Sequence, residues 1–424
     1  MSKDITNYET SLENAKKLFI YSYAIVTSGV LSRGKASQKY TLYHGRKFVK
    51  ASDKDTSSVV RPNNDNLYSA AWTQLINSPY ILEIPDITDR YILANILNTK
   101  TDVPFAVGSK NPDTTEKKYI FIYRDNEVPT GYEDYQIVRC EDSRNFFLIR
   151  LEAFNEADFK TANAIQDKII FKAIYPEKLQ DRGEAIVGLT TDFIESLTTK
   201  EFYQEFASAF IDTVIDEDYI KLAKAFGIEG ENGSYDDAYD DILNAGREAA
   251  YKEITTYSSN IVASSNGWTY NVDNGNYGEN YLYRARVAYF GYGANLAEDS
   301  IYPSYGGQIL YSDKNYKIHF NKGTLPYAEF FWSITLYGEP SQYLTDNELD
   351  RYVINSHMLD DLYYNEDGSL DIYLMNTKPT DDTLIPNWLP SPLDEKTFSL
   401  TMRIYGPSKE QLNGEFEGPQ VSEI

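Results

Sequence analysis

Cysteine and histidine, the side chains that most often build disulfides and zinc sites, are scarce in this chain of 424 residues. Cys140 is the single cysteine, which excludes a disulfide within the chain, and we expect its thiol to be buried, as free thiols usually are. His44, His319 and His357 are isolated, so no pair has the spacing of zinc ligands. The sequence therefore predicts no metal centre and argues against a cupin-type site.

The chain also lacks a long apolar run. Its least polar stretch, residues 18–31, is interrupted by Ser22, Thr27 and Ser28, whereas a membrane-spanning helix needs about 20 mainly apolar residues. The start, Met1 to Asp4, is not a basic segment followed by an apolar core, so no secretory signal is visible. We therefore expect a soluble, cytoplasmic protein, with export still open if a leader precedes this sequence.

Basic residues are outnumbered, with 40 Lys and Arg against 64 Asp and Glu and a net charge of −24. A field of this sign repels phosphate backbones and anionic lipids, so we expect neither nucleic acid nor a membrane as partner. The phosphate-cradling glycine loop, the dinucleotide fingerprint and the Gly-x-Ser-x-Gly elbow are missing as well. ATP, NAD and serine-hydrolase chemistry therefore have no support in the sequence.

Tyrosine, by contrast, is abundant, with 37 copies. Its large apolar ring and single hydroxyl suit half-buried sheets, and they also suit surfaces that bind sugars or rings. Packing within sheets is the commoner explanation. The length of the chain exceeds what one hydrophobic core usually holds, which predicts two or three packed units.

The order of apolar and turn residues predicts where helices and strands lie. A helix starts at a capping box formed by Thr10 and Glu13 and stops near Gly29. A second helix over 156–168 is capped by Asn155. Further helices are predicted within 190–261 and over 279–292. Short strands separated by turn residues are predicted at 67–75, 80–84, 91–96, 119–123, 135–138, 146–151, 316–320, 330–336, 370–375 and 398–404.

These elements predict a mainly β fold with helical insertions (α+β), in which two jelly-roll-like β-sandwich units are linked by a helical segment. Asp367-Gly368 is a strong turn signal before the strand that follows. The expected division is given by residue number: a lead-in with the first helix at 1–50, the first sandwich at 51–180, the helical segment at 181–276, the second sandwich with its leading helix at 277–412, and a loose tail at 413–424.

Two blocks of sequence carry a resemblance to known families. Residues 60–72 read Val-Arg-Pro-Asn-Asn-Asp-Asn-Leu-Tyr-Ser-Ala-Ala-Trp and, with Pro85 and Arg90-Tyr91, resemble the domain of unknown function 1254. Asn66 stands where that family usually has Thr. The second block resembles the domain of unknown function 1214, although Tyr327 replaces its usual second proline. This block comprises Tyr277-Gly278, Tyr281, Arg284-Ala285, Gly291, Gly293 to Leu296, Glu298-Asp299, Tyr302-Pro303, Leu325-Pro326, Phe331 to Ser333, Leu344, Asn347, Arg351-Tyr352, Asp367 to Leu370 and Asn387 to Pro390.

The resemblance covers roughly residues 50–410. It implies two β-sandwich units of jelly-roll type with helices between and around them. It implies no reaction.

One stripe of the helix that starts the second block carries Tyr281, Arg284 and Asn295 at helical spacing. A buried arginine needs an anionic partner, and Asp299 and Asp65 are the expected ones. Two interpretations stay open: an Arg–Asp clamp that joins the two domains, or a pocket that receives a polar or anionic ligand. Both require Asp65 and Arg284 to meet in space.

We expect an inter-domain pocket built from both blocks. Trp388, which we expect in a loop, is a candidate platform for a ligand, whereas Trp332 is expected in the core. Oxygen atoms of Asn63, Asp65, Asn295, Asp299 and Asn347 suit Ca²⁺ or Mg²⁺, but Asx turns are the commoner use of such residues, so no cofactor is predicted. The candidate ligand-binding residues are Arg61, Asn63, Asp65, Tyr68, Trp72, Tyr281, Arg284, Asn295, Asp299, Tyr302 and Trp388.

Three functions remain open. The first is binding of a small-molecule or carbohydrate-type ligand. The second is a cofactor-independent hydrolase or lyase with Asp65 or Asp299 as general base and Arg284 or a tyrosine stabilising charge. A carboxylate beside an arginine has a lowered pKa, which counts against the second function. The third is a structural role in a homo-oligomer, with these clusters as interface.

Overall fold

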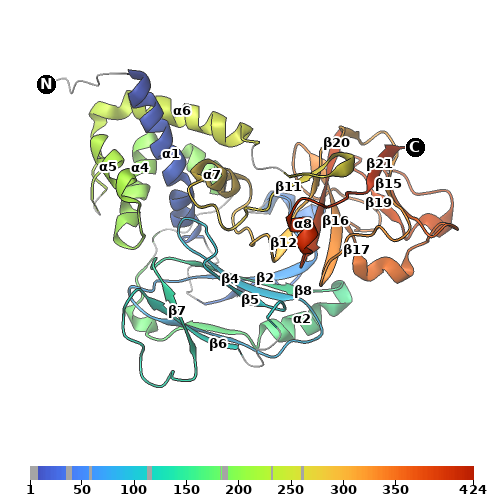
Figure 1. The fold of residues 1–424 in the computed structure, drawn as a ribbon, viewed down its shortest axis with the longest axis horizontal. Helices are drawn as coiled ribbons and strands as arrows, with labels where there is room; N and C mark the ends of the chain where they lie inside the picture. The colour runs from blue at the N-terminus through green and yellow to red at the C-terminus, as the bar shows by residue number, and fades with distance from the viewer. Residues whose placement is uncertain are drawn as a thin grey trace.

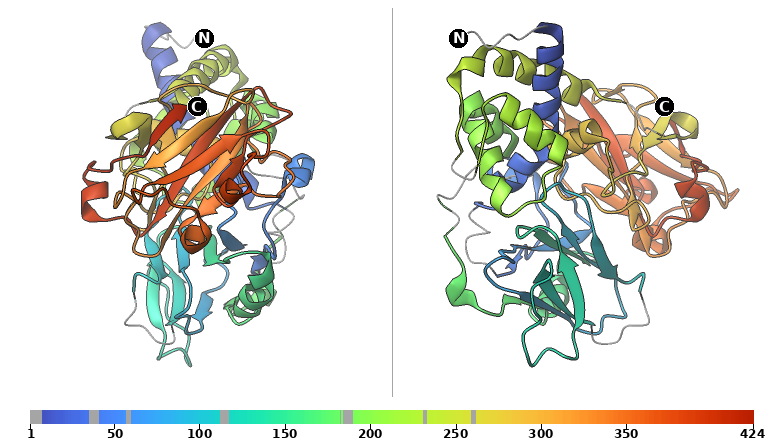
Figure 2. Two further views of the ribbon diagram at one scale, coloured as in Figure 1. Left: turned by 90° about the vertical axis from the view of Figure 1, so that its right-hand side faces the viewer. Right: turned by 60° about the vertical axis from the view of Figure 1, so that its left-hand side comes forward.

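The computed structural model describes residues 8–34, 41–56, 60–111, 117–181, 183, 190–230, 233–258 and 262–424. A group of helices, an N-terminal β unit and a C-terminal β unit form three bodies that touch one another (Figure 1). The views in Figure 2 show the C-terminal unit against both the helices and the N-terminal unit. In the described part of the chain, every helix is too short or too polar to cross a lipid bilayer.

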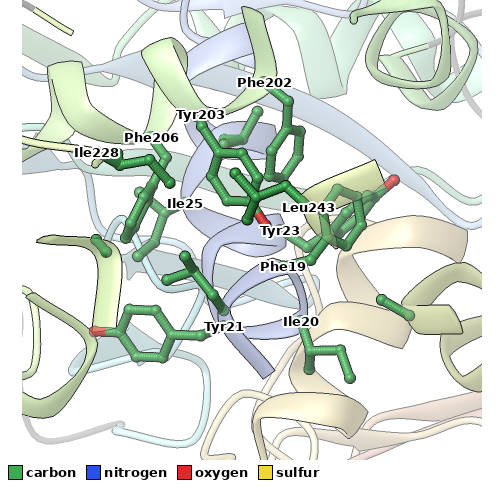
Figure 3. Packing of buried hydrophobic residues seen from close by; sticks show 14 of the residues in the cluster. Phe19, Ile20, Tyr21, Tyr23, Ile25, Phe202, Tyr203, Phe206, Ile228 and Leu243 are labelled. Carbon is green, nitrogen blue, oxygen red and sulfur yellow. The ribbon is translucent and has the colours of Figure 1, made fainter. Parts of the chain in front are cut away.

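Helix α1 (Tyr8–Leu31) is the centre of the helical body. It is buried on nearly all sides, as expected for a helix that is apolar around its circumference. Phe19 stacks on Phe202 with ring centroids 4.3 Å apart, and further rings close around it (Figure 3). The surrounding helices are α3 (Thr190–Ser196), α4 (Thr199–Ser208), α5 (Glu217–Ala225), α6 (Asp240–Thr256) and α7 (Tyr281–Phe290).

The predicted stop of the first helix at Gly29 is wrong, because α1 continues to Leu31. Gly29 lies inside the helix, and the position that a Cβ would take there is 2.9 Å from Nη1 of Arg144, the end of a flexible side chain. The side chain of Thr10, half of the predicted capping box, lies outside the described residues.

The N-terminal unit consists of two sheets that share one core. The first has the order β1 (Tyr43–His44), β2 (Asn66–Trp72), β8 (Phe146–Glu152), β4 (Ile92–Leu97), β5 (Phe105–Gly108). The second has the order β7 (Gln136–Cys140), β6 (Lys117–Tyr123), β3 (Tyr80–Ile84), β9 (Ile170–Ala173). The helix predicted at 156–168 is present as a 3-10 turn followed by α2 (Phe159–Gln166), and the side chain of Asn155 caps the turn as expected.

The C-terminal unit also pairs two sheets over one core. In the larger sheet the path is β10 (Val262–Ala263), β11 (Trp268–Tyr270), β13 (Ser304–Tyr305), β20 (Thr397–Tyr405), β16 (Phe331–Glu339), β17 (Val353–Asn355), with β12 (Ser300–Ile301) and β14 (Leu310–Tyr311) also paired to β20. The smaller sheet has the order β19 (Trp388–Pro390), β18 (Leu370–Met375), β15 (Tyr316–Phe320), β21 (Gln420–Glu423). A short helix, α8 (Lys409–Leu412), precedes β21. The mainly β fold with helices is thus confirmed, and its sheets are open.

The prediction of a loose tail at 413–424 is wrong, because β21 pairs antiparallel with β15. Phe416 and Val421 are buried. The mostly polar composition of the tail concealed this strand, since an edge strand needs few apolar side chains to dock. The turn at Asp367-Gly368 is confirmed: Gly368 has a φ of 82°, and its N–H donates to the carbonyl of Asn365 over 2.8 Å.

Successive side chains of these strands point alternately into the core and to the outer face, and the outer faces form the region between the two β units. In β2 and β8 every second residue, such as Leu67 and Ile149, enters the N-terminal core, so the residues between them form an outer face. β16 and β20 likewise alternate, with Ile334 and Met402 in the C-terminal core. The two outer faces pack on each other, since Tyr91 lies against Phe331, and β16 is buried on both sides.

Gly246 offers a test of how closely α1 and α6 pack. A Cβ there would lie 2.8 Å from the backbone carbon of Ala15 and 2.9 Å from the backbone nitrogen of Lys16. The gain in helix propensity from Gly246→Ala is about 1 kcal/mol, and we expect overpacking of about 1–3 kcal/mol to outweigh it. Urea unfolding should show a net loss of stability.

Gly291→Ala is the matched control, because nothing lies within 4 Å of its added Cβ. If Gly246→Ala is as stable as the control variant, the close α1–α6 approach is contradicted.

Candidate functional site

The two outer sheet faces enclose a buried polar layer, which we call the junction. On the N-terminal side, Tyr68 of β2 is directly paired with Arg150 of β8. On the C-terminal side, Ser333 of β16 is paired with Arg403 of β20. Arg150 and Arg403 are each 4% exposed. Charged groups so far from water need compensating hydrogen bonds or charges.

Asp65 enters the junction from the loop before β2. Its Oδ2 accepts a hydrogen bond of 2.6 Å from the Ser333 hydroxyl, which joins the two units. Its Oδ1 is buried and has no hydrogen-bond partner among the described residues. Burial raises the pKa of Asp65, and the nearby charge of Arg403 lowers it in part. The loop is held by Asn63, whose Oδ1 accepts from the backbone N–H of Asp65 over 2.7 Å in an Asx turn.

Arg403 is held by neutral acceptors. Its guanidinium donates to the hydroxyls of Thr335 over 2.7 Å and Tyr337 over 2.6 Å, and to the Arg61 carbonyl over 3.3 Å. No ion pair joins it to a carboxylate in the part of the chain that the structure describes. Burial disfavours the charged form of Arg403 and would lower its pKa. Electrostatic interactions with Tyr337, Tyr405 and Asp65 favour the charged form more strongly, so the pKa of Arg403 lies above its ordinary value. The side chain therefore carries a positive charge into the junction.

Arg150 has the same kind of environment on the opposite sheet. It donates to Oδ1 of Asn95 over 3.2 Å and to the carbonyl of Gly293, and it lies 5.6 Å from the ring centroid of Tyr68. Gly293 has a φ of 97°, a conformation that favours glycine. Across the described ranges, Arg150 also forms no ion pair. Burial opposes its charge, but neighbouring phenols, Tyr68 first, raise its pKa.

Asp299 lies beyond Arg150, just before β12. It is 6% exposed, and its Oδ2 has no hydrogen-bond partner among described atoms. Burial raises the pKa of Asp299 to about 6, although Lys110 and Arg150 lower it in part. This carboxyl therefore titrates close to neutral pH, in contrast to an exposed aspartate.

Tyrosine and asparagine side chains connect the two ends of the junction. The hydroxyl of Tyr405 accepts from Nδ2 of Asn63 over 2.7 Å and of Asn66 over 2.9 Å. The hydroxyl of Tyr302 accepts from Nδ2 of Asn295 over 2.9 Å. The hydroxyl of Tyr91 and Oδ1 of Asn66 are buried without partners in the described structure.

A histidine and a glutamate close one side of the junction. Nε2 of His357 lies 2.5 Å from Oε1 of Glu152, and Oε2 of Glu152 accepts from the backbone N–H of Tyr91 over 2.9 Å. The hydrogen bond to Glu152 raises the pKa of His357. The pair links the 3-10 turn after β17 to the end of β8, so it fastens the two units together.

A pocket of about 250 Å³ opens at the edge of the junction, and we call it the rim pocket. Asn64, a neighbour of Asp65, forms part of its wall, as does Asn355, which is paired with Ser333. Both β units therefore contribute. Its lining residues are Phe48, Val49, Lys50, Asn64, Phe154, Asn155, Glu156, Leu349, Asp350, Arg351, Tyr352, Val353, Asn355 and Met358.

A second pocket, of about 460 Å³, lies in the helical body between α4 and α6. Its wall includes Lys200, Asp240, Arg247 and Tyr251. None of the residues predicted from sequence to bind a ligand lines this pocket or the rim pocket. Within the described residues, no cluster of three His, Cys, Asp or Glu side chains is arranged to hold a metal ion.

Comparison with known families now identifies both β units. Residues 40–173 match the profile of a protein of unknown function (DUF1254), and residues 301–409 match that of a protein of unknown function (DUF1214). This chain belongs to the DUF1254/DUF1214 family. The resemblance read from the two sequence blocks is thereby confirmed.

One solved structure shares this fold, and a second is more distant. The VPA0106 protein from Vibrio parahaemolyticus has a TM-score of 0.71 at 18% identity, covering 98% of this chain and 100% of that chain. An uncharacterized protein from Burkholderia cenocepacia has a TM-score of 0.48 at 12% identity, covering 99% and 96% of the two chains. The first likeness shows the fold alone. No curated protein matches the chain.

The expected partner of Arg284 in this DUF1254/DUF1214 protein is wrong. Arg284 forms its ion pair with Asp102, at 2.9 Å, and not with Asp65 or Asp299. Asp102 lies in the loop between β4 and β5, where the sequence carries no signal of a buried charge. The contact clamps α7 to the N-terminal β unit.

The prediction that Asp65 and Arg284 share one pocket is therefore also wrong. They lie in different clusters: Asp65 contacts Ser333, whereas Arg284 contacts Asp102 and the Gly278 carbonyl. Tyr281 accompanies Arg284, and its hydroxyl donates to Oδ2 of Asp216 over 2.6 Å. Of the predicted site residues, the junction brings together Asn63, Asp65, Tyr68, Asn295, Asp299 and Tyr302.

The three other predicted residues lie apart from the junction's centre. Trp388 is 2% exposed in strand β19, and its indole N–H donates to the Met375 carbonyl over 2.7 Å, so the expected loop position is wrong. Flanking Asn387 and Pro390 suggested a loop because neither favours strands. Trp72 is buried at the end of β2, and Arg61 forms an ion pair with Glu339 at 2.7 Å. Trp332 is in the core as predicted.

The junction residues of this DUF1254/DUF1214 protein that sequence reasoning missed include Tyr91, Arg150, Arg403 and Tyr405, and also Asn66, Glu152, Ser333 and His357. Arg403 and Tyr405 lie in β20, where polar and apolar residues alternate, a pattern that usually indicates a solvated face. Tyr91 and Arg150 lie beside β4 and in β8, whose nearly continuous apolar runs indicate burial but do not show what a lone polar residue contacts. A usable signal was present in β16, where Phe331, Ser333 and Thr335 share a face without a charged residue. Such a face suits burial against another protein surface.

The Arg284–Asp102 pair can be tested by Asp102→Asn. The substitution leaves the Arg284 guanidinium, 5% exposed, without a countercharge, so we expect a loss of about 3 kcal/mol in the free energy of unfolding. Asp218→Asn is the control, because its pair with Lys221 is 91% and 69% exposed and should cost less than about 0.5 kcal/mol. Equal losses in urea titrations of the two variants would rule out the clamp.

Proposed function

We propose that this protein binds a small polar molecule, of which carbohydrate-type molecules are examples, at the junction between its two β units. The observation that carries the proposal is the convergence of buried polar atoms without partners in the described structure: Oδ1 of Asp65, Oδ1 of Asn66, the hydroxyl of Tyr91 and Oδ2 of Asp299. Each such atom costs about 1–3 kcal/mol if it stays unsatisfied. A ligand that supplies their hydrogen bonds would recover this energy on binding.

The two guanidinium groups support the same proposal. Arg150 and Arg403 each carry a positive charge into the layer, and neither contacts a carboxylate among the described side chains. Both interact electrostatically with the hydroxyls of Tyr68 and Tyr405. Buried charges in proteins are normally paired or fully hydrogen-bonded. A polar ligand beside them would add a compensating group to charges that neutral acceptors hold.

The rim pocket supports the proposal because it lies beside this layer. Its wall residue Asn64 is followed directly by Asp65, and Oδ1 of Asn64 is itself unpartnered in the described structure. The wall also includes Asn355 from the other family domain. Ligand sites are commonly concave and lie between domains. We also propose that each two-sheet unit is a jelly-roll-type sandwich, because each core lies between two largely antiparallel sheets.

A cofactor-independent hydrolase or lyase is the second candidate, and Asp299 favours it. Its pKa of about 6 suits a general base near neutral pH. No arginine is in contact with this carboxyl in the described structure, so the objection that a paired carboxylate is a weak base does not apply to it. Arg150 is near enough to act on its charge and would stabilise negative charge that develops on a substrate.

Screening tests the binding proposal. We expect some compounds in a panel of small polar metabolites to raise the unfolding temperature of the wild-type protein, since a ligand at about 100 times its Kd adds about 2.7 kcal/mol. Tyr405→Phe keeps the ring but removes the hydroxyl that accepts from Asn63 and Asn66, and we expect roughly tenfold weaker binding. Tyr327→Phe, on an exposed ring, should bind as the wild type does.

Compounds that bind Tyr405→Phe and Arg403→Lys as tightly as the wild type must bind elsewhere, and they would contradict the proposed place. A panel without any stabilising compound would contradict binding itself.

Titration tests the role of Asp299. Because its pKa in the folded protein exceeds that of an unfolded aspartate, its contribution to stability is lost as pH rises from about 4 through about 6. Asp299→Asn should remove this loss, so the variant gains ~3 kcal/mol relative to the wild type between pH 4 and pH 7. Carbon NMR of labelled aspartates should show one resonance with a midpoint near 6 that disappears in the variant. A midpoint near 4 would exclude Asp299 as a base at neutral pH.

A further inference from the structure

Apolar side chains form much of the wall of the rim pocket. They are Phe48, Val49, Phe154, Leu349, Val353 and Met358, and they come from both β units. Phe48 packs edge-on against Phe159 with ring centroids 4.9 Å apart, and the ring of Phe154 lies 5.1 Å from that of His357, so neighbouring side chains hold both rings in place. The volume of about 250 Å³ equals that of about eight waters at about 30 Å³ each. A small molecule with an apolar body suits this space.

Four charged residues line the same pocket, and three of them contact one another. Nζ of Lys50 lies 3.0 Å from Oε1 of Glu156 and 3.0 Å from Oδ2 of Asp350. The lysine therefore has two countercharges, one from each β unit. Arg351, the fourth charged residue, forms no ion pair in the part of the chain that the structure describes.

The guanidinium of Arg351 is only partly used by the protein. Its Nη1 donates to the carbonyls of Ile385, Pro386 and Trp388 over 2.7, 3.1 and 2.9 Å. Nε and Nη2 meet no acceptor among the described residues and are not among the fully buried atoms, so both remain accessible. Burial lowers the pKa of Arg351, and no described carboxylate offsets this. A carboxylate would supply the countercharge and accept from both nitrogens, which share one edge of the guanidinium, in a bidentate pair.

Asn64 adds a buried acceptor to the wall. The residue is 5% exposed, and its Nδ2 donates to the carbonyl of Val49 over 3.2 Å, which fixes the orientation of the amide. Its Oδ1 has no partner in the described structure. Buried acceptors in folded proteins are normally hydrogen-bonded. A hydroxyl or N–H group on a molecule in the pocket would meet this requirement.

From these contacts we infer that the rim pocket is a binding site of its own, for a small monocarboxylic acid that has an apolar body and one hydrogen-bond donor. The carboxylate binds Arg351, the donor binds Oδ1 of Asn64, and the body packs against Phe48 and Phe154. The inference uses the wall of the rim pocket alone, so it does not rest on binding at the junction.

Ligand-detected NMR on the full chain tests the inference with four probes that share one phenylpropyl body. Phenyllactate and para-hydroxyphenylpropionate carry a carboxylate and a hydroxyl, with the hydroxyl at opposite ends of the molecule. Phenylpropionate keeps only the carboxylate, and phenylpropanol has no carboxylate. We expect saturable binding of at least one hydroxy acid. Phenylpropionate and phenylpropanol should each bind about tenfold more weakly, because each lacks one of the two polar contacts.

Two variants assign these contacts to the rim pocket. Arg351→Gln should weaken binding of the hydroxy acid about tenfold and leave phenylpropanol unchanged, since only the acid pairs with the guanidinium. Asn64→Leu, which is close in shape, should weaken the hydroxy acid to the level of phenylpropionate and leave phenylpropionate unchanged.

Each variant has a matched control that should bind as the wild type does. Arg139→Gln removes an exposed guanidinium that likewise donates to backbone carbonyls through Nη1. Asn126→Leu changes an exposed asparagine. Urea unfolding curves show whether each variant is folded. If Arg351→Gln is not, the comparison of the acids with phenylpropanol on the wild type decides the role of the carboxylate.

Equal affinities for the acids and phenylpropanol would overturn the inference, as would binding that survives both Arg351→Gln and Asn64→Leu. A lack of binding by every acid would overturn it as well. A polar metabolite whose binding is weakened by Tyr405→Phe would in that case leave the proposed function intact, so failure of the rim site and failure of the junction are distinguishable.

Discussion

Burial of two polar sheet faces against each other is the constraint on which this architecture depends. Each β unit has its own apolar core, so its outer face would ordinarily meet water. Here the outer faces of the β2–β8–β4 and β16–β20 strands meet instead, and polar groups such as Arg150 and Arg403 lose their hydration. They must then be satisfied by protein or by ligand, because unsatisfied polar groups are costly in a dry interior. The Asp65–Ser333 and Tyr405–Asn66 hydrogen bonds across the junction answer part of this requirement.

The helical body is joined to the N-terminal β unit by a different kind of contact. Its own core is aromatic and closes around α1, whereas its links to the N-terminal sheets include ion pairs such as that between Arg284 and Asp102. That pair contacts no residue of the junction in the described structure, so its role is positional, although Nε of Arg284 is itself buried without a partner there. The segment from α7 to β12 leads from the clamp to Asn295 and Asp299. A structural ion pair and an incompletely bonded polar layer thus lie at the two ends of one short stretch of chain.

Much of the fold follows from local patterns, and part of the site does too. Strands β3, β15 and β18 have the bounds that alternation and turn residues predicted, because those signals act within a few residues. Asp65 and Asp299 were singled out as candidates, and both are buried. Arg284 was assigned the wrong partner because helical spacing shows which face an arginine occupies, and not what packs against that face. Trp388 was placed in a loop because its neighbours disfavour strands, yet it pairs with β18.

By itself, the sequence determined the two-family architecture, the mainly β content, the helical middle and the acidic, cysteine-poor character of the chain. These depend on composition, on periodicity and on motifs read along the chain. The tertiary structure alone decided that Arg150 and Arg403 are buried and held by neutral acceptors, and that the chain end forms β21. The reason is that a strand's outer face looks the same in sequence whether it meets water or another sheet, and only the packing of distant segments removes the water.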